Sequence, residues 1–185
     1  MNLTRALTIA SPGDEQVLIR PLEVSDADAL AAAYLRNREH LAPWEPKHAE
    51  PFFTTAGQES VIQDKLALSE AGSELPWVVA TGKDIIGMIT LTGIVRGPFL
   101  NANLGYWIDE AWTGRGAASG AVSAVVMMAA EDLGLHRIQA ATLVHNGASQ
   151  AVLKRCGFEK IGLASDYLRI AGEWQDHVLF QRILF

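Results

Sequence analysis

The stretch Asp109–Gly120, "DEAWTGRGAASG", is the most informative part of the chain. It sets Gly114, Gly116 and the small residues after them between a strand-like segment, "NLGYWI" (103–108), and an apolar helix pattern that ends near Leu133. Glycine at a strand-to-helix turn lets the backbone approach a ligand and points free N–H groups at it. The usual ligand there is a phosphate. The stretch therefore predicts a phosphate-binding turn.

Three other glycine-dependent motifs do not match this turn. A Walker loop would end in Gly-Lys-Ser or Gly-Lys-Thr, which is missing here. A Rossmann fingerprint would need a third glycine where Ser119 stands, and it would follow the first strand of a βαβ unit. A serine-hydrolase elbow, Gly-x-Ser-x-Gly, surrounds neither Ser119 nor Ser149. The phosphate compound must therefore be of another kind.

Upstream of the turn, helix and strand signals alternate. A strand is predicted over 17–22, and a helix over 24–34 that Ser25 or Asp26 would cap. The two prolines of "LAPWEP" (41–46) end this helix. A second helix and an antiparallel meander of three strands are predicted over 54–72, 75–81, 84–95 and 101–109.

Downstream of the turn, the pattern changes to strand–helix–strand. A strand is predicted over 137–144, and a short helix with Asn146 as its N-cap and Gly157 as its stop. Two closing strands are predicted over 158–162 and 176–184. Together the segments predict an α/β fold with a mixed, mostly antiparallel central sheet flanked by helices, in a single domain over 1–185.

Composition narrows the function. The chain has 185 residues, 49% of them hydrophobic, and a net charge of -6, which argues against a nucleic-acid partner and favours cationic substrates such as amines or basic protein tails. Its five histidines form no HExxH motif or close pair, so no metal site is predicted.

Three features predict a cytoplasmic protein without membrane contact. The longest apolar run, 121–130, is shorter than the roughly 20 residues that span a bilayer. The first residues, "MNLTRALTIASPGDEQ", lack the hydrophobic region and cleavage site of an export signal. Cys156 has no partner cysteine, and we interpret it as a core residue.

Three segments together resemble the GNAT superfamily of N-acetyltransferases, and within it the RimJ/RimL branch of ribosomal-protein N-terminal acetyltransferases. The resemblance covers about Ile19 to Phe180. It rests on "LGYWIDEAWTGRGAASGAV", "LHRIQAATLVHNGASQAVLKRCGFEKIG" and "DYLRIAGEWQDHVLF". It implies the GNAT fold, with a splayed strand pair that binds acetyl-coenzyme A as cosubstrate.

The resemblance also implies positions for the coenzyme. The turn would bind its pyrophosphate through backbone N–H groups of Thr113, Gly114, Arg115, Gly116, Ala117, Ala118 and Ser119. Thr113 departs from the Gln or Arg usual in the family. The pantetheine arm would pair with the strand at Trp107 and Ile108 and contact Asn146 and Ser149, although core packing and helix capping also explain these four residues. Lys154 and Arg155 would either reach the ribose phosphate or lie on a solvated helix face.

The activity implied is direct attack of a primary amine on the acetyl thioester, without a covalent enzyme intermediate. Ser149 would protonate the departing thiolate, and a backbone N–H of the "YWI" strand would stabilise the oxyanion. The base stays open between Asp166, Asp109, Glu110 and a water relay. The aromatic residues expected at the acceptor's entrance are Tyr34, Trp44, Trp112 and Tyr167.

The acceptor predicted by the resemblance is the N-terminal α-amine of a protein, such as a ribosomal protein. A small-molecule amine acetyltransferase and a non-catalytic coenzyme A sensor stay as alternatives. The sequence leaves open whether the protein is a monomer or a dimer.

Overall fold

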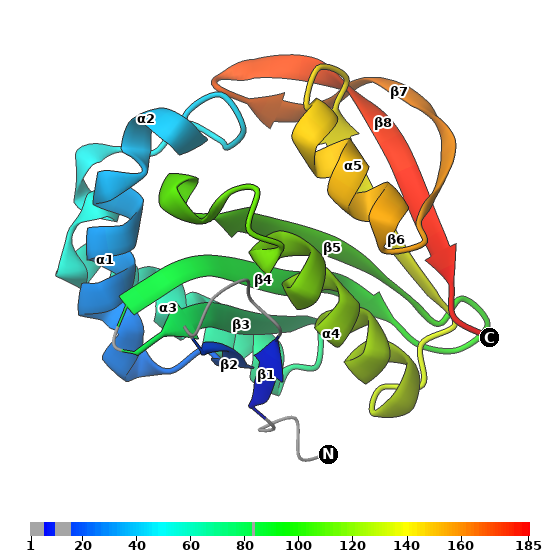
Figure 1. Ribbon diagram of the computed structural model, residues 1–185, viewed down its shortest axis with the longest axis horizontal. Helices are drawn as coiled ribbons and strands as arrows, with labels where there is room; N and C mark the ends of the chain where they lie inside the picture. The colour runs from blue at the N-terminus through cyan, green and yellow to red at the C-terminus, as the bar shows by residue number, and fades with distance from the viewer. Residues whose placement is uncertain (1–5, 10–15, 83) are drawn as a thin grey trace.

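An eight-stranded sheet forms the centre of the computed structural model, which describes residues 6–9, 16–82 and 84–185 (Figure 1). Its strand order is β1-β2-β3-β4-β5-β6-β8-β7, and every neighbouring pair is antiparallel except β5 with β6. The strands are β1 (Leu7–Ile9), β2 (Val17–Pro21), β3 (Glu74–Thr81), β4 (Asp84–Val95), β5 (Asn101–Ile108), β6 (Arg137–Leu143), β7 (Glu159–Ile170) and β8 (Glu173–Ile183).

Helices cover both faces of this sheet. One hydrophobic cluster contains the apolar side of α4. On the other face, Leu30 of α1 and Ile62 of α3 pack in a second cluster with Val78 of β3 and Met88 of β4. The α-helices are α1 (Ala27–Arg36), α2 (Arg38–Leu41), α3 (Thr55–Glu70), α4 (Ala117–Glu131) and α5 (Gly147–Arg155). Short 3-10 turns lie at η1 (Val24–Asp26), η2 (Glu50–Phe53) and η3 (Glu110–Trp112).

The parallel pair β5–β6 separates partway along its length. Asn101 to Leu104 pair with Arg137 to Ala140, and no pairing continues beyond Leu104. The second half of β5 therefore pairs only with β4, and the end of β6 only with β8. The backbone N–H and C=O groups on the facing edges are left free for another chain-like molecule. This is the splayed strand pair that the resemblance implies.

The expected mixed sheet and its flanking helices are confirmed. Asn146 caps α5 as predicted, since its Oδ1 accepts a hydrogen bond from the Ser149 N–H at 3.0 Å. Gly157 ends the helix with a φ of +78°, a left-handed conformation that glycine adopts without strain.

Other expectations need correction. The side chain of Asp26 makes no capping bond to α1; it accepts instead from Arg20, at 2.8 and 2.6 Å, and from the N–H of Glu23. The closing strands are longer than predicted, because β7 and β8 form one extended hairpin around Gly172. Strand β1 and helix α2 were not predicted. Most of the first 16 residues, in which no export signal is expected, lie outside the described residues.

Candidate active site

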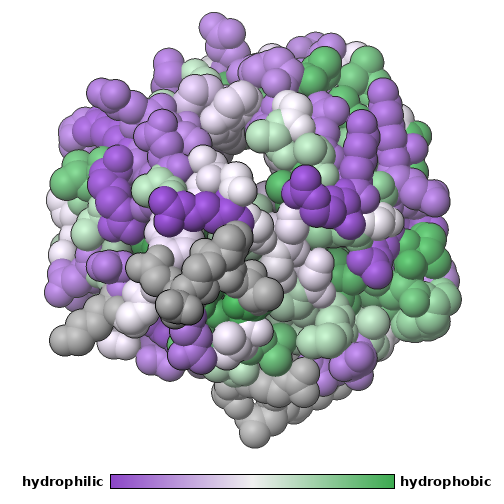
Figure 2. Space-filling model, viewed as in Figure 1, coloured by the Kyte–Doolittle hydropathy of each residue, from purple (hydrophilic) through white to green (hydrophobic). Residues whose placement is uncertain are grey.

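The gap between β5 and β6 opens onto a cavity of about 480 Å³, which we call the turn cavity. Its walls come from the end of β5, the glycine-rich turn, α2 with the segment that follows it, and the length of α5. Figure 2 shows the surface hollowed between the positions that α2 and α5 occupy in Figure 1. Of the predicted coenzyme-binding residues, those that line it are Trp107, Ile108, Thr113, Gly114, Gly116, Ala118, Ser119, Asn146 and Ser149.

The glycines of the turn face open space. Gly114 and Gly116 have φ values of +74° and +83°, and a Cβ built on either would meet no atom within 4 Å. Gly116 is the N-cap of α4 and makes no side-chain capping bond. The first N–H groups of α4 thus start at the rim of the cavity, where the helix dipole favours an anion. The residues present fit the pyrophosphate of a coenzyme.

The other residues of the turn divide by position. Arg115 is exposed and its guanidinium lies 5.3 Å from the ring centre of Trp112, whereas Ala117 is fully buried in the core. Arg155 lines the turn cavity and donates a hydrogen bond to Ser119 Oγ at 3.2 Å. Lys154 is exposed and does not line the cavity. Of the two cations considered for a ribose phosphate, only Arg155 lines the turn cavity.

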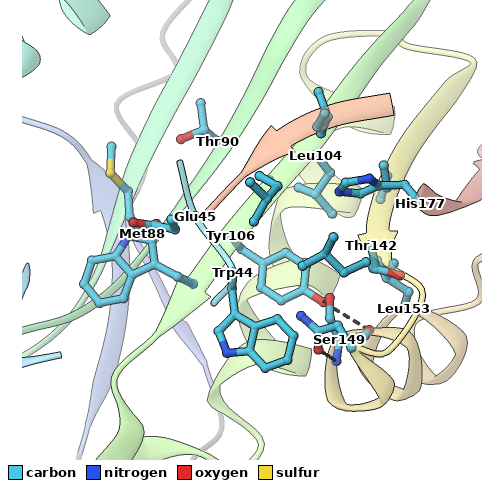
Figure 3. A pocket seen from close by; sticks show the side chains of 18 of the residues that line it. Trp44, Glu45, Met88, Thr90, Leu104, Tyr106, Thr142, Ser149, Leu153 and His177 are labelled. Carbon is cyan, nitrogen blue, oxygen red and sulfur yellow. Dashed lines mark hydrogen bonds between the residues drawn. The ribbon is translucent and has the colours of Figure 1, made fainter. Parts of the chain in front are cut away.

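Tyr106 and Ser149 meet where the turn cavity enters the gap. The Tyr106 hydroxyl lies 2.9 Å from Ser149 Oγ, and Figure 3 shows the two side chains pointing toward each other. Burial raises the pKa of Tyr106 to about 12, so its hydroxyl stays protonated at neutral pH. The tyrosine can therefore donate to Ser149 Oγ and leave the serine hydrogen free for a ligand. Sequence reasoning missed Tyr106.

A second cavity of about 320 Å³, the sheet cavity, continues through the gap. It shares residues with the turn cavity and extends to Thr90, Thr142 and His177 (Figure 3). His177 is buried, and its Nδ1 lies 2.8 Å from the Gln175 carbonyl oxygen, so Nδ1 donates a hydrogen bond to that oxygen. The Thr142 hydroxyl is buried without a hydrogen-bond partner. The shared residues are Trp44, Glu45, Tyr106, Trp107, Asn146 and Ser149.

The aromatic residues expected at the entrance occupy different places. Trp44 lines both cavities, and Trp112 lines the turn cavity. Tyr34 lines the sheet cavity, where its hydroxyl accepts a hydrogen bond from Trp107 Nε1 at 2.9 Å. Tyr167 is 42% exposed on β7 and lines neither cavity.

The carboxylates considered as bases lie outside both cavities. Asp166 is exposed, has a φ of +47°, and its N–H donates to Asp176. Glu110 is exposed on η3. Asp109 is buried and accepts hydrogen bonds from Arg36 Nε at 2.6 Å and Asn37 Nδ2 at 2.8 Å. These contacts make Asp109 a link between α1 and the end of β5 rather than a free proton acceptor.

Burial by itself would raise the pKa of Asp109. The hydrogen bonds from Asn37, Arg36 and the Ala111 N–H outweigh that effect and hold the pKa below its ordinary value. Cys156 is buried in the main core cluster, as predicted. Within the described ranges, no three His, Cys, Asp or Glu side chains gather as a metal site. Nor does that part of the chain contain a helix with the length and apolar character to cross a membrane.

A separated parallel strand pair beside a glycine-rich turn that opens a helix is the arrangement of the GNAT fold, a fold of coenzyme A-dependent acetyltransferases. The chain belongs to the GNAT acetyltransferase family: residues 16–159 match the model of the acetyltransferase (GNAT) domain. It is an N-acetyltransferase that uses acetyl-coenzyme A as cosubstrate.

Close relatives lie in the RimJ/RimL branch. The chain is 35% identical over 167 residues to the ribosomal protein uS5-alanine N-acetyltransferase of Escherichia coli, covering 89% of this chain and 86% of that one. The ribosomal-protein-S5-alanine acetyltransferase of Vibrio fischeri superposes with a TM-score of 0.87 at 36% identity, over 94% and 96% of the chains. Mycobacterium smegmatis RimJ in complex with CoA-disulfide superposes with a TM-score of 0.92 at 29% identity, over 97% and 88%.

Proposed function

We propose that the protein acetylates the N-terminal α-amine of another protein, a ribosomal protein being the leading class. One observation carries the proposal: the turn cavity and the sheet cavity meet at Ser149 and share six lining residues. A coenzyme arm entering along the turn cavity and an amine entering by the sheet cavity would therefore face each other in the gap between β5 and β6.

The relatives point to the α-amine. Two of them are named as alanine N-acetyltransferases of ribosomal protein S5 or uS5. An alanine residue has no side-chain nitrogen, so the acetylated atom must be an α-amine at a chain terminus. The net charge of -6 also favours association with a basic protein segment.

The site residues have distinct roles in this reaction. Backbone N–H groups of Thr113 to Ser119 would hold the pyrophosphate, and the free edge of β5 at Trp107 and Ile108 would pair with the pantetheine amides. A β5 N–H would stabilise the oxyanion. Ser149, oriented by Tyr106, would supply the proton that the departing thiolate needs.

The ionisation of the acceptor supports the same choice. An α-amine has a pKa near ~7.8, so about a tenth of it is already the free nucleophile at pH 7. A lysine side chain, with a pKa near ~10.4, is free to less than about one part in a thousand and needs roughly 3 kcal/mol more help. A site with a remote or water-relayed base would therefore serve α-amines far better than lysines.

A competition within one peptide tests the proposal. The peptide carries a free N-terminal alanine and an internal lysine, and its matched control has the same sequence with a blocked N-terminus. After incubation with the protein and acetyl-coenzyme A, mass spectrometry should find one acetyl group on the N-terminal alanine and none on the control. Acetylation of the lysine, or turnover of small amines without any peptide product, would contradict the α-amine and favour a small-molecule acetyltransferase. A failure of every peptide and small amine to release free thiol from acetyl-coenzyme A would favour the non-catalytic sensor.

A further inference from the structure

Glu45 lies where three cavities around the gap meet. A third cavity of about 460 Å³, the loop cavity, lies beside α2 and is lined by Arg38, Lys47 and His48 among others. Among the residues that the structure describes, Glu45 alone lines the turn, sheet and loop cavities, and it is the one carboxylate lining any of them. Figure 3 shows Glu45 and Trp44 across the cavity from His177 and Thr142.

Several contacts hold Glu45 in place. It follows α2 in the segment between Pro43 and Pro46, two residues that restrict the backbone. Its N–H donates to the Leu41 carbonyl at 3.2 Å, and its carbonyl accepts from the Ala171 N–H at 2.9 Å. This hydrogen bond attaches the segment 43–46 to the turn between β7 and β8. Position 45 is thus set by α2 on one side and the β7–β8 hairpin on the other.

The carboxylate is largely enclosed. Its side chain is 20% exposed, and Oε2 lies 3.3 Å from His48 Nε2. Burial raises the pKa of Glu45 to about 7, although the charge of Lys65 on α3 acts to lower it. Lys65 itself is paired with Glu74 at 2.6 Å. The other titratable or charged residues lining its cavities are Tyr34, Arg38, His40, Lys47, Tyr106, Arg155 and His177.

We infer that Glu45 is the general base, accepting the proton that the acceptor's ammonium must lose before attack. The inference rests on the proposed function, since it needs an amine acceptor at the gap. Glu45 and Ser149 both line the junction of the turn and sheet cavities, so one can receive a proton while the other gives one. His48 is a positioning residue, because its ring holds the carboxylate oxygen.

The proton balance is complete with these groups. Glu45 takes one proton from the ammonium, and the neutral nitrogen then forms the C–N bond as the C–S bond breaks. The nitrogen loses a second proton on becoming an amide, and this proton replaces the one that Ser149 delivers to the sulfur. One proton thus ends on the thiol and one leaves to solvent, by way of the loop cavity, whose wall residues Arg38 and Lys47 are exposed.

Other groups are less suited to this role. Asp109 is held by Arg36 and Asn37, and Asp166 lies outside the three cavities. His177 lines the sheet cavity but not the turn cavity, so it lies away from the groove along which the coenzyme would run. A base with a pKa near that of an α-ammonium can accept its proton readily, whereas a lysine ammonium would transfer roughly 10³-fold less favourably.

The test is the isosteric variant Glu45→Gln, with Glu39→Gln as its matched control. Glu39 is an exposed carboxylate on the neighbouring helix α2 and lines none of the cavities. With an N-terminal alanine peptide, kcat/KM of the wild type should rise as pH passes through about 7. Glu45→Gln should lower kcat/KM about 10²- to 10³-fold and leave only the later rise, near ~7.8, that comes from the acceptor's own α-amine, while coenzyme affinity measured by calorimetry stays within about threefold. Glu39→Gln should behave as wild type.

A second acceptor separates proton removal from a structural role. A peptide with an aminooxy group at its N-terminus has a nitrogen that is already neutral at pH 7 and needs no base before attack. The loss in Glu45→Gln should shrink at least about tenfold with this peptide. An equal loss with both peptides, or an unchanged pH profile, would overturn the inference.

Two other outcomes of the Glu45→Gln experiment also have a definite meaning. If Glu45→Gln fails to bind coenzyme, Glu45→Asp replaces it: a shortened carboxylate should keep the pH-dependent rise at reduced kcat, and loss of the rise would count against the inference. If the wild type acetylates small amines and no peptide, the proposed α-amine acceptor fails. The Glu45 measurements then apply unchanged to the reactive amine and still decide the role of this residue.

Discussion

The Tyr106 hydroxyl lies 2.9 Å from Ser149 Oγ, and this contact joins β5 to α5 across the gap between β5 and β6. The Ser149 N–H is already used by the Asn146 side chain at 3.0 Å. Asn146 thus caps the helix, and Tyr106 orients the Ser149 hydroxyl. The capping role and the chemical role of "NGAS" (146–149) are compatible, since they use different atoms.

Ser149→Ala should lower kcat about 10²-fold with KM little changed, because a proton delivered to the thiolate acts mainly in the transition state. Tyr106→Phe keeps the ring and removes only the hydroxyl, so a smaller loss of about three- to tenfold is expected from a less well-oriented serine. Steady-state kinetics with the alanine peptide measures both. A Ser149→Ala kcat within about threefold of wild type would leave Ser149 with only its place in the first turn of α5.

Gly116→Asp should abolish coenzyme binding. The φ of +83° at this position strains any side chain, and a carboxylate there would project beside the site expected for the pyrophosphate. Calorimetry with acetyl-coenzyme A measures the effect. Gly72→Asp is the matched control, since Gly72 has a φ of +73° and equally open surroundings but lies after α3. Undiminished affinity in folded Gly116→Asp would remove the turn from the binding site.

Local chemistry made much of the fold predictable. The helix cap at Asn146, the stop at Gly157 and the glycine turn each depend on neighbouring residues along the chain, so the sequence pattern states them directly. The long β7–β8 hairpin was underestimated because most β7 residues are exposed and show no buried alternation. Exposed strands of this kind are defined by their pairing partner, which no local pattern reveals.

The role that we infer for Glu45 could not be predicted from the sequence, for a similar reason. Glu45 lies in a proline-flanked segment whose pattern predicts only the end of a helix. Its burial beside the coenzyme and acceptor sites comes from three cavities that meet only after folding. The available signal was a carboxylate beside Trp44 in a rigid "PWEP" segment (43–46). Asp109 shows the converse case: it stands next to the turn in sequence, but its hydrogen bonds to Arg36 and Asn37 depend on contacts more than 70 residues apart.

Asp109→Ala should destabilise the protein by about 2 kcal/mol, because it leaves the Asn37 amide and the Ala111 N–H without their acceptor. The pKa of Asp109 is held below its ordinary 3.8, so its contribution is present above that pH and is lost as pH falls through the lower folded pKa. Urea denaturation at neutral pH and near pH 3 should show the difference between the two proteins shrinking in acid. A constant difference would mean that the carboxylate charge plays no part.

The raised pKa of Glu45 has the opposite effect on stability from the lowered pKa of Asp109. A glutamic acid ionises near pH 4.5 in the unfolded chain, whereas burial raises the pKa of Glu45 to about 7 in the folded protein. Between these values only the folded protein keeps the proton, so this group lowers the free energy of unfolding as pH rises, and the loss is complete above about pH 7.

Glu45→Gln has no charge at this position, so it should be about as stable as wild type near pH 4 and more stable near pH 8, by about 3 kcal/mol at most. Urea denaturation at both pH values measures the two free energies of unfolding, and Glu39→Gln should show no such divergence. A glutamine variant less stable than wild type near pH 8 would mean that contacts with His48 and Lys65 stabilise the ionised carboxylate. The pKa of Glu45 would then be too low for a base that works near neutral pH. The expected result is a protein that gains stability and loses activity through one substitution, as a buried base requires.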